Sequence, residues 1–377
     1  MELLVMALLL AAILAGQYLL YSRLGLKNLS YSLTISSDEA FEGEEIEIIE
    51  EIENAKALPL PWIRTEISCS RWLTFKGQQA AADGEQRGLI SGVFLLKGHQ
   101  KCRRAWRVRC EKRGVFTVED AAVSVSDLFG LAKPTAVFGI KRSIRVLPLP
   151  ADMDAGEMSS EAFIGDIPVK RFVLPDPFVI SGAQEYSGRE PMNRIHWAHS
   201  ARIGTLMVYS SEYTTERSVL VILNMQRNGL SVQQKLSVPV LEAQIKAAAF
   251  VLDDCCKMRM QCALSANAAK PLIITADEGY EHTMNALRNL AELKNGCSEH
   301  IDDFIREQDF NGFTDVIFIS CFMTQVMADT AEALYKAGKC CKLFTTDVDE
   351  ESGDVPPCCE VRLIPRGRYY PPAEGED

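Results

Sequence analysis

The run Val219-Leu220-Val221-Ile222-Leu223 decides how the second half of this chain folds. Five consecutive apolar residues, mostly β-branched, are typical of a strand that is buried on both faces. Helical and strand-like stretches alternate after this run. The helical stretches are 240–258, 281–294 and 324–337, and the strand-like ones are 261–265, 315–320, 340–345 and 360–364. This alternation predicts a mostly parallel α/β sheet of the Rossmann type over 218–377.

The first half has a different period. Short alternating stretches are broken by turn residues and show no helical repeat, which is typical of a β-sandwich. These stretches are 31–36, 45–53, 62–70, 88–97, 104–110, 115–118 and 122–126. The sequence therefore predicts a β-sandwich domain over 28–150. Residues 151–217, whose first part contains prolines and glycines, are interpreted as a crossover between the two domains.

The N-terminus predicts a membrane anchor over 1–27. Residues 3–21 are almost entirely apolar, and a helix of that span at about 1.5 Å per residue nearly crosses a hydrocarbon core of about 30 Å. Glu2 precedes the run, whereas Arg23 and Lys27 follow it. The positive-inside bias then predicts a single-pass protein of the cell membrane whose body lies in the cytoplasm.

Charge and cysteine usage limit the classes of function. The formal net charge of -11 argues against a nucleic-acid partner, because affinity for nucleic acid depends on clustered Lys and Arg. The twelve cysteines include three adjacent pairs and no C-x-x-C spacing, which favours reduced thiols over a disulfide framework or a zinc site. The chain also lacks G-x-G-x-x-G, G-x-x-x-x-G-K and G-x-S-x-G motifs, so a familiar nucleotide enzyme or serine hydrolase is not expected.

The most distinctive stretch is 184–202, which reads QEYSGREPMNRIHWAHSAR. It resembles the signature of the bacterial family catalogued as domain of unknown function 58, which has a REY, then GD-P, then IHWK-x-x-AR pattern. Upstream, Arg113-Gly114-Val115-Phe116 and Asp127-Leu128-Phe129-Gly130-Leu131 resemble further family motifs, as does Pro175-Asp176-Pro177-Phe178. The departures are Gln184 for Arg, Arg189 and Glu190 for Gly and Asp, and Ala198 for Lys.

The resemblance implies a membrane-tethered protein with a von Willebrand A-like C-terminal half. It also implies a protein partner, with a MoxR-type AAA ATPase or a second von Willebrand A protein as the candidates. No enzymatic activity is established for the family. The signature residues Glu185, Tyr186, Arg194, His196, Trp197 and Arg202 are interpreted as structural, with Trp197 buried in a joint that ties the crossover to the α/β domain.

A working von Willebrand A domain binds Mg²⁺ through a D-x-S-x-S loop after its first strand, because a hard cation prefers carboxylate and hydroxyl oxygens. Here the corresponding positions are Asn224, Gln226 and Asn228. We therefore expect a degenerate site that holds neither a metal nor another cofactor. The remaining oxygen ligands in this half that could substitute are Ser231, Asp277 and Asp315.

Two classes of function follow from these observations. The first is a membrane-anchored, non-catalytic scaffold or assembly protein that binds its partner through loops of the α/β domain. The alternative is a metal-dependent hydrolase, because His196 and His199 are three residues apart and Glu185 could join them.

Overall fold

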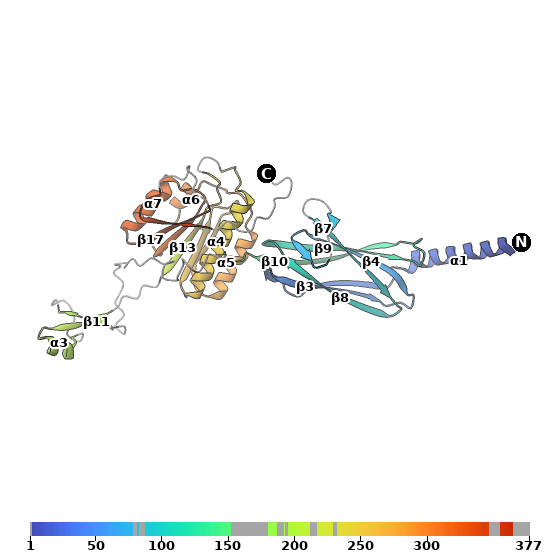
Figure 1. Ribbon diagram of the computed structural model, residues 1–377, viewed down its shortest axis with the longest axis horizontal. Coiled ribbons are helices and arrows are strands. Elements are labelled where there is room, and N and C mark those ends of the chain that lie inside the picture. Colours follow the sequence, from blue (N-terminus) through green and yellow to red (C-terminus); the bar gives the residue numbers. More distant parts are fainter. Residues whose placement is uncertain are drawn as a thin grey trace.

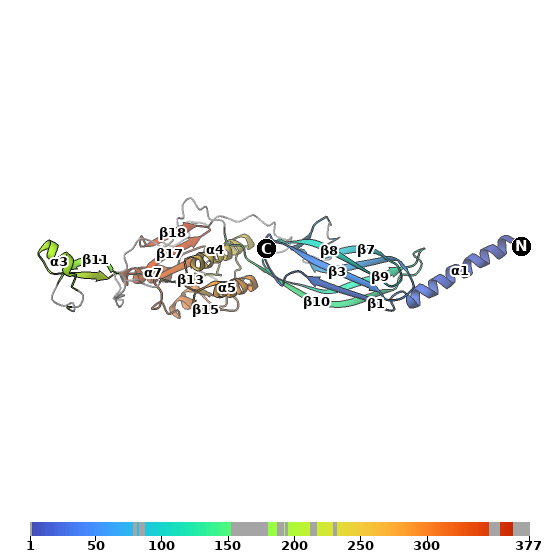
Figure 2. The same ribbon diagram turned by 90° about the horizontal axis from the view of Figure 1, so that it is seen from below.

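The computed structural model describes most of the chain. The described residues are 2–77, 81–82, 87–151, 180–186, 192, 195–211, 217–228, 232–346 and 355–364. Figures 1 and 2 show an apolar helix, a pair of packed sheets and a helix-covered sheet following one another along the long axis of the molecule. A small two-stranded unit, separate from these sheets, carries the described residues of the 184–202 signature.

Helix α1 (Glu2–Leu24) begins the chain. Residues Leu3–Leu24 have a mean hydropathy of 2.4 over their most apolar window, and none of that window is buried inside the protein. The helix is thus long and apolar enough to cross a membrane, and Arg23 lies in its last turn.

Two sheets form the β-sandwich that follows α1. The first has the strand order β1-β3-β8-β5 and the second β2-β10-β9-β4-β7-β6. The strands are β1 (Leu29–Ile35), β2 (Glu39–Phe41), β3 (Glu45–Asn54), β4 (Leu60–Ser70), β5 (Leu73–Phe75), β6 (Ala81–Ala82), β7 (Arg87–Leu96), β8 (Gln100–Cys110), β9 (Gly114–Ser126) and β10 (Thr135–Leu147). Alternate residues of β3 are buried, as the period of two requires for a sheet with one wet face.

The sandwich differs from the sequence-based prediction in several details, since the two- and three-residue strands β2, β5 and β6 were also not predicted. The stretches 115–118 and 122–126 are one continuous strand, β9. Strand β10 was not predicted, because Gly139, Lys141 and Arg142 interrupt its apolar alternation. The register of β10 against β9 shifts between Gly139 and Arg142, so an irregularity carries the strand past this interruption.

The C-terminal sheet has the order β15-β14-β13-β16-β17-β18, and only β15 runs antiparallel to its neighbour. Its strands are β13 (Ser218–Leu223), β14 (Gln261–Ala266), β15 (Leu272–Asp277), β16 (Asp315–Ile319), β17 (Cys340–Thr345) and β18 (Cys359–Leu363). Its helices are α4 (Val238–Lys257), α5 (Tyr280–Glu292), α6 (Ile301–Arg306) and α7 (Gln325–Lys336). The sequence did not predict β15 or α6, and both are only six residues long.

All six residues of β13 are buried, which explains its continuous apolar run. Val219, Val221 and Leu223 pack in the cluster formed with α4 and α5. Leu220 and Ile222 pack in the cluster formed with α6 and α7, on the other face (Figure 1). The first cluster also includes Leu147 from the end of β10, so the apolar core continues from the α/β sheet into the sandwich.

Candidate functional site: the carboxyl edge of the α/β sheet

Three polar residues follow three neighbouring parallel strands at one edge of the C-terminal sheet. Asn224 follows β13, Asn267 follows β14, and Ser320 follows β16. Their side chains are almost completely buried, with exposed fractions of 1%, 0% and 0%. This carboxyl edge is where open α/β sheets most often bind their ligands.

The three side chains form one hydrogen-bonded network. Asn224 Nδ2 donates to Ser320 Oγ at 2.9 Å, and Asn267 Nδ2 donates to Asn224 Oδ1 at 3.2 Å. Asn224 Oδ1 also accepts from the Gln226 backbone N–H at 3.0 Å, and Asn267 Oδ1 accepts from the Met225 N–H at 2.7 Å. Both amide oxygens are therefore already used by N–H donors of the protein.

Gln226 and Gln244 extend this amide network. Gln226 is fully buried; its Oε1 accepts from Ile301 N at 3.1 Å, and its Nε2 donates to the Asn228 carbonyl at 2.6 Å. With its amide oriented to match its neighbours, the fully buried Gln244 donates to the Asn224 carbonyl and accepts from Cys321 N, each at 3.1 Å. The network thus joins α4, α6 and the ends of three strands without a formal charge.

This donor set does not fit a Mg²⁺ ion. The cation prefers carboxylate oxygens, whereas Asn224 and Gln226 supply amide oxygens that N–H groups already occupy. Asp277 and Asp315 lie at the amino edge of the sheet, because β15 ends opposite Cys262 and β16 begins at Asp315. Ser231 lies outside the described residues. Within the described ranges, no three His, Cys, Asp or Glu side chains are grouped as metal ligands.

The exposed part of the carboxyl edge is the 224–228 loop. Arg227 is exposed, and its carbonyl accepts from Cys321 Sγ at 3.3 Å. Asn228 is half-buried and donates to Gln234 Oε1 at 3.0 Å. The loop therefore exposes the positively charged Arg227, and the uncharged amide network lies buried beneath it.

The described signature residues belong to a separate small unit made of β11 (Ile180–Glu185), β12 (Met207–Ser211) and α3 (Trp197–Ile203). His196 caps α3, since its Nδ1 accepts from His199 N at 3.3 Å. Ser200 is buried; its Oγ donates to the His196 carbonyl at 2.9 Å and accepts from Met207 N at 2.7 Å. Tyr186 is half-buried, and its N–H donates to the Leu206 carbonyl at 2.8 Å.

The expected burial of Trp197 is wrong. Trp197 is 67% exposed and Arg202 is also exposed, whereas Ile195 is only 4% exposed, paired with Val208. A two-stranded sheet and a seven-residue helix have too little surface to cover a tryptophan on their outer side.

The proposed hydrolytic constellation is only partly described. The rings of His196 and His199 are 5.6 Å apart between centroids, and Nδ1 of His196 is used in capping. The backbone of Glu185 pairs with Met207, but its side chain lies outside what the structure describes, and so does the signature residue Arg194. The alternative function thus stays a prediction.

A different residue joins the two large parts of the molecule. Arg113, directly before β9, is 7% exposed, and its Nε donates to Glu242 Oε2 on α4 at 2.8 Å. Its Nη1 donates to the carbonyls of Leu290, Ala291 and Leu293 at 2.8, 3.2 and 3.0 Å. A guanidinium from the sandwich therefore caps the C-terminus of α5, where a positive charge is favourable.

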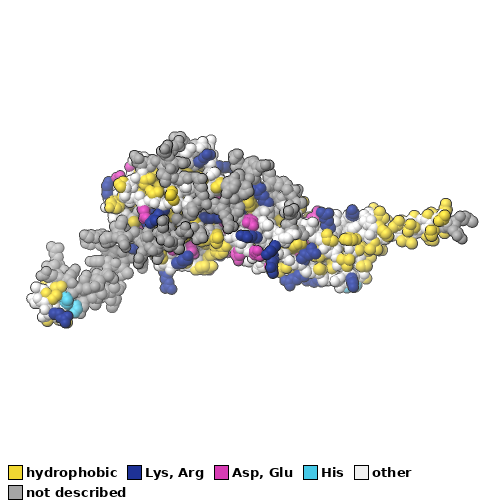
Figure 3. All heavy atoms as spheres, in the orientation of Figure 1, with side chains coloured by type: hydrophobic (Ala, Val, Ile, Leu, Met, Phe, Trp, Pro, Cys, Tyr) yellow, Lys and Arg dark blue, Asp and Glu magenta, His cyan; other side chains and the backbone are white. Residues whose placement is uncertain are grey.

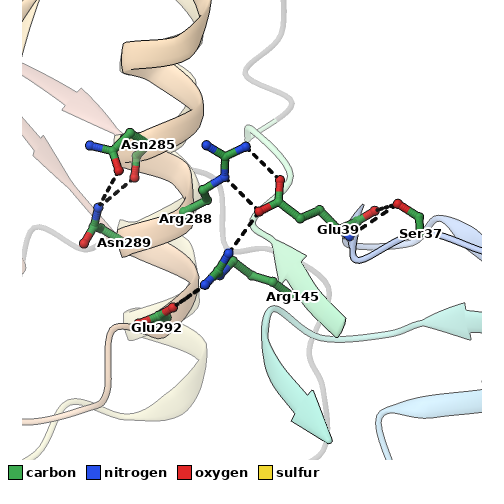
Figure 4. A network of polar contacts seen from close by, with 7 residues as sticks. All are labelled: Ser37, Glu39, Arg145, Asn285, Arg288, Asn289 and Glu292. Atoms are coloured by element: carbon green, nitrogen blue, oxygen red, sulfur yellow. Dashed lines mark hydrogen bonds and ion pairs between the residues drawn. The ribbon is translucent and has the colours of Figure 1, made fainter. Parts of the chain in front are cut away.

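A second set of charges surrounds this joint. Figure 4 shows Glu39 of the sandwich between Arg145 and Arg288, with bonds from Arg288 Nε at 2.8 Å and from Arg145 Nη1 at 3.0 Å. Arg145 also donates to Glu292 Oε1 at 2.9 Å. The hydrogen bond from Arg288 is the main cause that lowers the pKa of Glu39, and Arg145 adds to it. The network links β2 and β10 of the sandwich to α5.

Comparisons with known proteins give no family. No family model matches the chain, and no curated protein matches it significantly. Among solved structures it is similar to a non-cellulosomal cohesin from Archaeoglobus fulgidus, with 18% identity over 31% of this chain and 91% of that chain and a TM-score of 0.23. A CARDB domain from Pyrococcus furiosus (10% identity, 31% and 91% covered, TM-score 0.21) and a Clostridium perfringens cohesin module (9%, 31% and 96%, 0.22) are also similar.

Sequence reasoning missed Asn267, Gln244 and Glu242 as members of these sites. Asn267 carries a usable signal, since it comes directly after a buried strand in the same position as Asn224. Gln244 and Glu242 lie within the apolar helix α4, and a polar residue buried in a helix of this kind signals a hydrogen-bonding partner.

Proposed function

We propose that this chain is a membrane-anchored, non-catalytic scaffold of the family catalogued as domain of unknown function 58. In this proposal α1 spans the cell membrane once, the body lies in the cytoplasm, and a von Willebrand A-like C-terminal domain binds a protein partner. The partner that the resemblance implies is a MoxR-type AAA ATPase or another von Willebrand A protein.

The buried amide network at the carboxyl edge is the observation that carries this proposal. Asn224 and Asn267 are neutral at every ordinary pH, and their polar atoms bond to the protein. General acid–base chemistry and metal-assisted hydrolysis need titratable or anionic side chains. The network itself consists of amide groups and the Ser320 hydroxyl, without a carboxylate, and its titratable neighbour is His300, whose Nδ1 lies 3.2 Å from Gln226 Nε2. The exposed Arg227, supported by a rigid and uncharged amide network, suits the binding of a partner with an acidic surface.

The joint at Arg113 supports a scaffold role. A buried pair between Arg113 and Glu242, together with three helix carbonyls, couples the sandwich to the α/β domain. The ion pair of Lys246 with Glu42, at 2.7 Å, adds a third connection between the same two parts. These contacts favour a body that holds its partner at a constant distance from the membrane.

The proposal is tested by co-purification from native membranes with the full chain as bait. We expect Arg227→Glu to reduce capture of the partner at least about tenfold, since reversing a charge in a complementary interface creates repulsion. Arg306→Glu is the matched control, because Arg306 is an exposed arginine at the end of α6. A different result would contradict the proposal: Arg227→Glu and Arg306→Glu capture the partner as well as the wild type does, but Trp197→Ala loses it. Partner binding would then belong to the signature unit.

A further inference from the structure

The end of the sandwich next to the membrane helix is tightly connected to that helix. Tyr21 of α1 is 5% exposed, and its hydroxyl donates to the Pro59 carbonyl at 2.9 Å. A Cβ on Gly25 would lie 3.2 Å from Pro134 Cγ, so the chain leaving α1 also touches the loop before β10. If α1 spans a bilayer, this end of the sandwich is held at the bilayer surface.

Four segments form this end, which we call the membrane-proximal rim: residues 23–28, 55–59, 97–100 and 127–134. They are linked directly. Ala55 N donates to the Asn28 carbonyl at 3.0 Å, and His99 N donates to the Lys56 carbonyl at 3.0 Å. The buried Asn54 amide donates to the carbonyls of Leu58 and Lys97 at 2.9 and 3.0 Å.

The loop 127–134 is held in one shape by Asp127. This carboxylate is fully buried, and its Oδ1 accepts from Leu131 N at 2.7 Å and from Ala132 N at 3.3 Å. Gly130 adopts a φ of 74°, which a residue with a side chain rarely adopts. The D-x-F-G-L motif singled out in the sequence is therefore a rigid turn.

This turn presents large apolar side chains to the outside. Leu128, Phe129 and Leu131 are 65%, 63% and 55% exposed. Trp62, which is 56% exposed, pairs with Ser126 at the start of the turn. Figure 3 shows apolar side chains continuing from α1 onto the adjoining end of the sandwich. A rigid loop that exposes three large apolar residues indicates a surface that is covered by a lipid bilayer or by another molecule.

The charge of the rim is opposite to that of the chain. The four segments contain the exposed Arg23, Lys27, Lys97 and Lys133, whereas the ammonium of Lys56 is buried and their single carboxylate is the buried Asp127. The whole chain has a formal net charge of -11. Lysines around exposed Leu, Phe and Trp residues are the combination that binds the interface of an anionic bilayer.

We propose that the membrane-proximal rim is a lipid-binding surface. Leu128, Phe129 and Leu131 enter the boundary between headgroups and acyl chains, while the surrounding lysines bind anionic headgroups. The occupant is the bilayer because α1 already tethers the rim to it and because the charges are complementary. The rim thus gives the body a second membrane contact, and this contact fixes the tilt of the sandwich.

The test uses the full chain in lipid nanodiscs with a photo-crosslinking benzophenone amino acid in place of Phe129. The matched control has the same group in place of Val115, which is 48% exposed at the opposite end of β9. We expect lipid adducts at position 129 and none at 115. We also expect phosphatidylglycerol nanodiscs to give a higher yield than phosphatidylcholine ones.

The triple change Lys27→Gln, Lys97→Gln and Lys133→Gln should lower the yield at position 129 at least about fivefold. Quenching of Trp62 fluorescence by brominated lipids provides a second readout that leaves the loop unchanged, with Trp62→Phe as its blank. Equal adduct yields at 129 and 115, or an unquenched Trp62, would overturn the lipid-binding surface. Equal yields in the two lipids would overturn the role of the lysines.

Discussion

Arg113 and Trp197 belong to two motifs of the same family resemblance, but their environments are opposite. Arg113 is 7% exposed and bonds to a carboxylate and three carbonyls, whereas Trp197 is 67% exposed on a seven-residue helix. Residue type alone would assign the tryptophan to the core and the arginine to the surface. The difference teaches that burial follows the partners that the fold supplies, because the C-terminus of α5 offers Arg113 the acceptors that it needs.

The largest effect is expected from Arg113→Ala. This change leaves Glu242 as a buried, unpaired carboxylate and removes the cap of α5, which should cost about 3–5 kcal/mol. In a domain of this size that corresponds to a fall of about 10 °C in the melting temperature of the full chain in detergent. Arg103→Ala is the control, because Arg103 is an exposed arginine of the same sandwich that pairs with Glu51. A fall of less than 2 °C for Arg113→Ala would show that the joint does not stabilise the body.

Glu39 should have a smaller, pH-dependent effect. Arg288 and Arg145 lower its pKa in the folded protein, so its stabilising contribution is present above the ordinary carboxylate pKa and is lost as the pH falls through the lowered value. Because the three side chains are partly exposed, we expect a contribution below about 1 kcal/mol.

The comparison of wild type with Glu39→Gln measures this contribution. The wild type should melt at a higher temperature at pH 7, and the difference should shrink as the pH falls below the ordinary carboxylate pKa and vanish below the lowered pKa of Glu39. A difference that persisted at the lower pH would mean that the charge of Glu39 is not what links the two domains.

Trp197→Ala should have the smallest effect on stability. An exposed side chain outside a packed core contributes within about 0.5 kcal/mol, so hydrogen exchange of the 195–211 amides should be unchanged. Ile195→Ala is the matched change inside the same unit, and it should accelerate exchange at Met207, since Ile195 is 4% exposed. Faster exchange in Trp197→Ala would mean that the indole is buried in solution and would remove the contrast with Arg113.

Periodicity predicted most strands and long helices, because both sheets bury regular faces. The continuous run 219–223 correctly indicated a strand covered on both sides, and the alternation of 45–53 indicated a sandwich strand. The antiparallel β15 was missed because most of its residues are exposed at the edge of the sheet, and α6 because six residues are too few to show a helical period. The joint at Arg113 was also missed, since its partners on α4 and α5 lie 129 or more residues away in sequence.

For the candidate site, the sequence indicated which residues stand after β13 but not what they do. The sequence predicts that Asn224 and Gln226 belong to a degenerate metal site, because neither a carboxylate nor a hydroxyl stands at the ligand positions. The structure adds the amide network with Asn267, Ser320 and Gln244, which no local pattern encodes because its members come from different elements.

The central claim is that the carboxyl edge binds a partner without a metal, through the exposed Arg227 above an uncharged amide network. The most direct test compares the melting temperature of the full chain in 10 mM MgCl₂ with that in EDTA. This MgCl₂ concentration is about 100 times a Kd of about 0.1 mM. We expect identical values, because the amide oxygens of Asn224 and Asn267 already accept from N–H groups. Binding of Mg²⁺ at that ratio would stabilise the protein by about 2.7 kcal/mol. A rise of several degrees in MgCl₂ that Asn224→Leu abolished would contradict the claim.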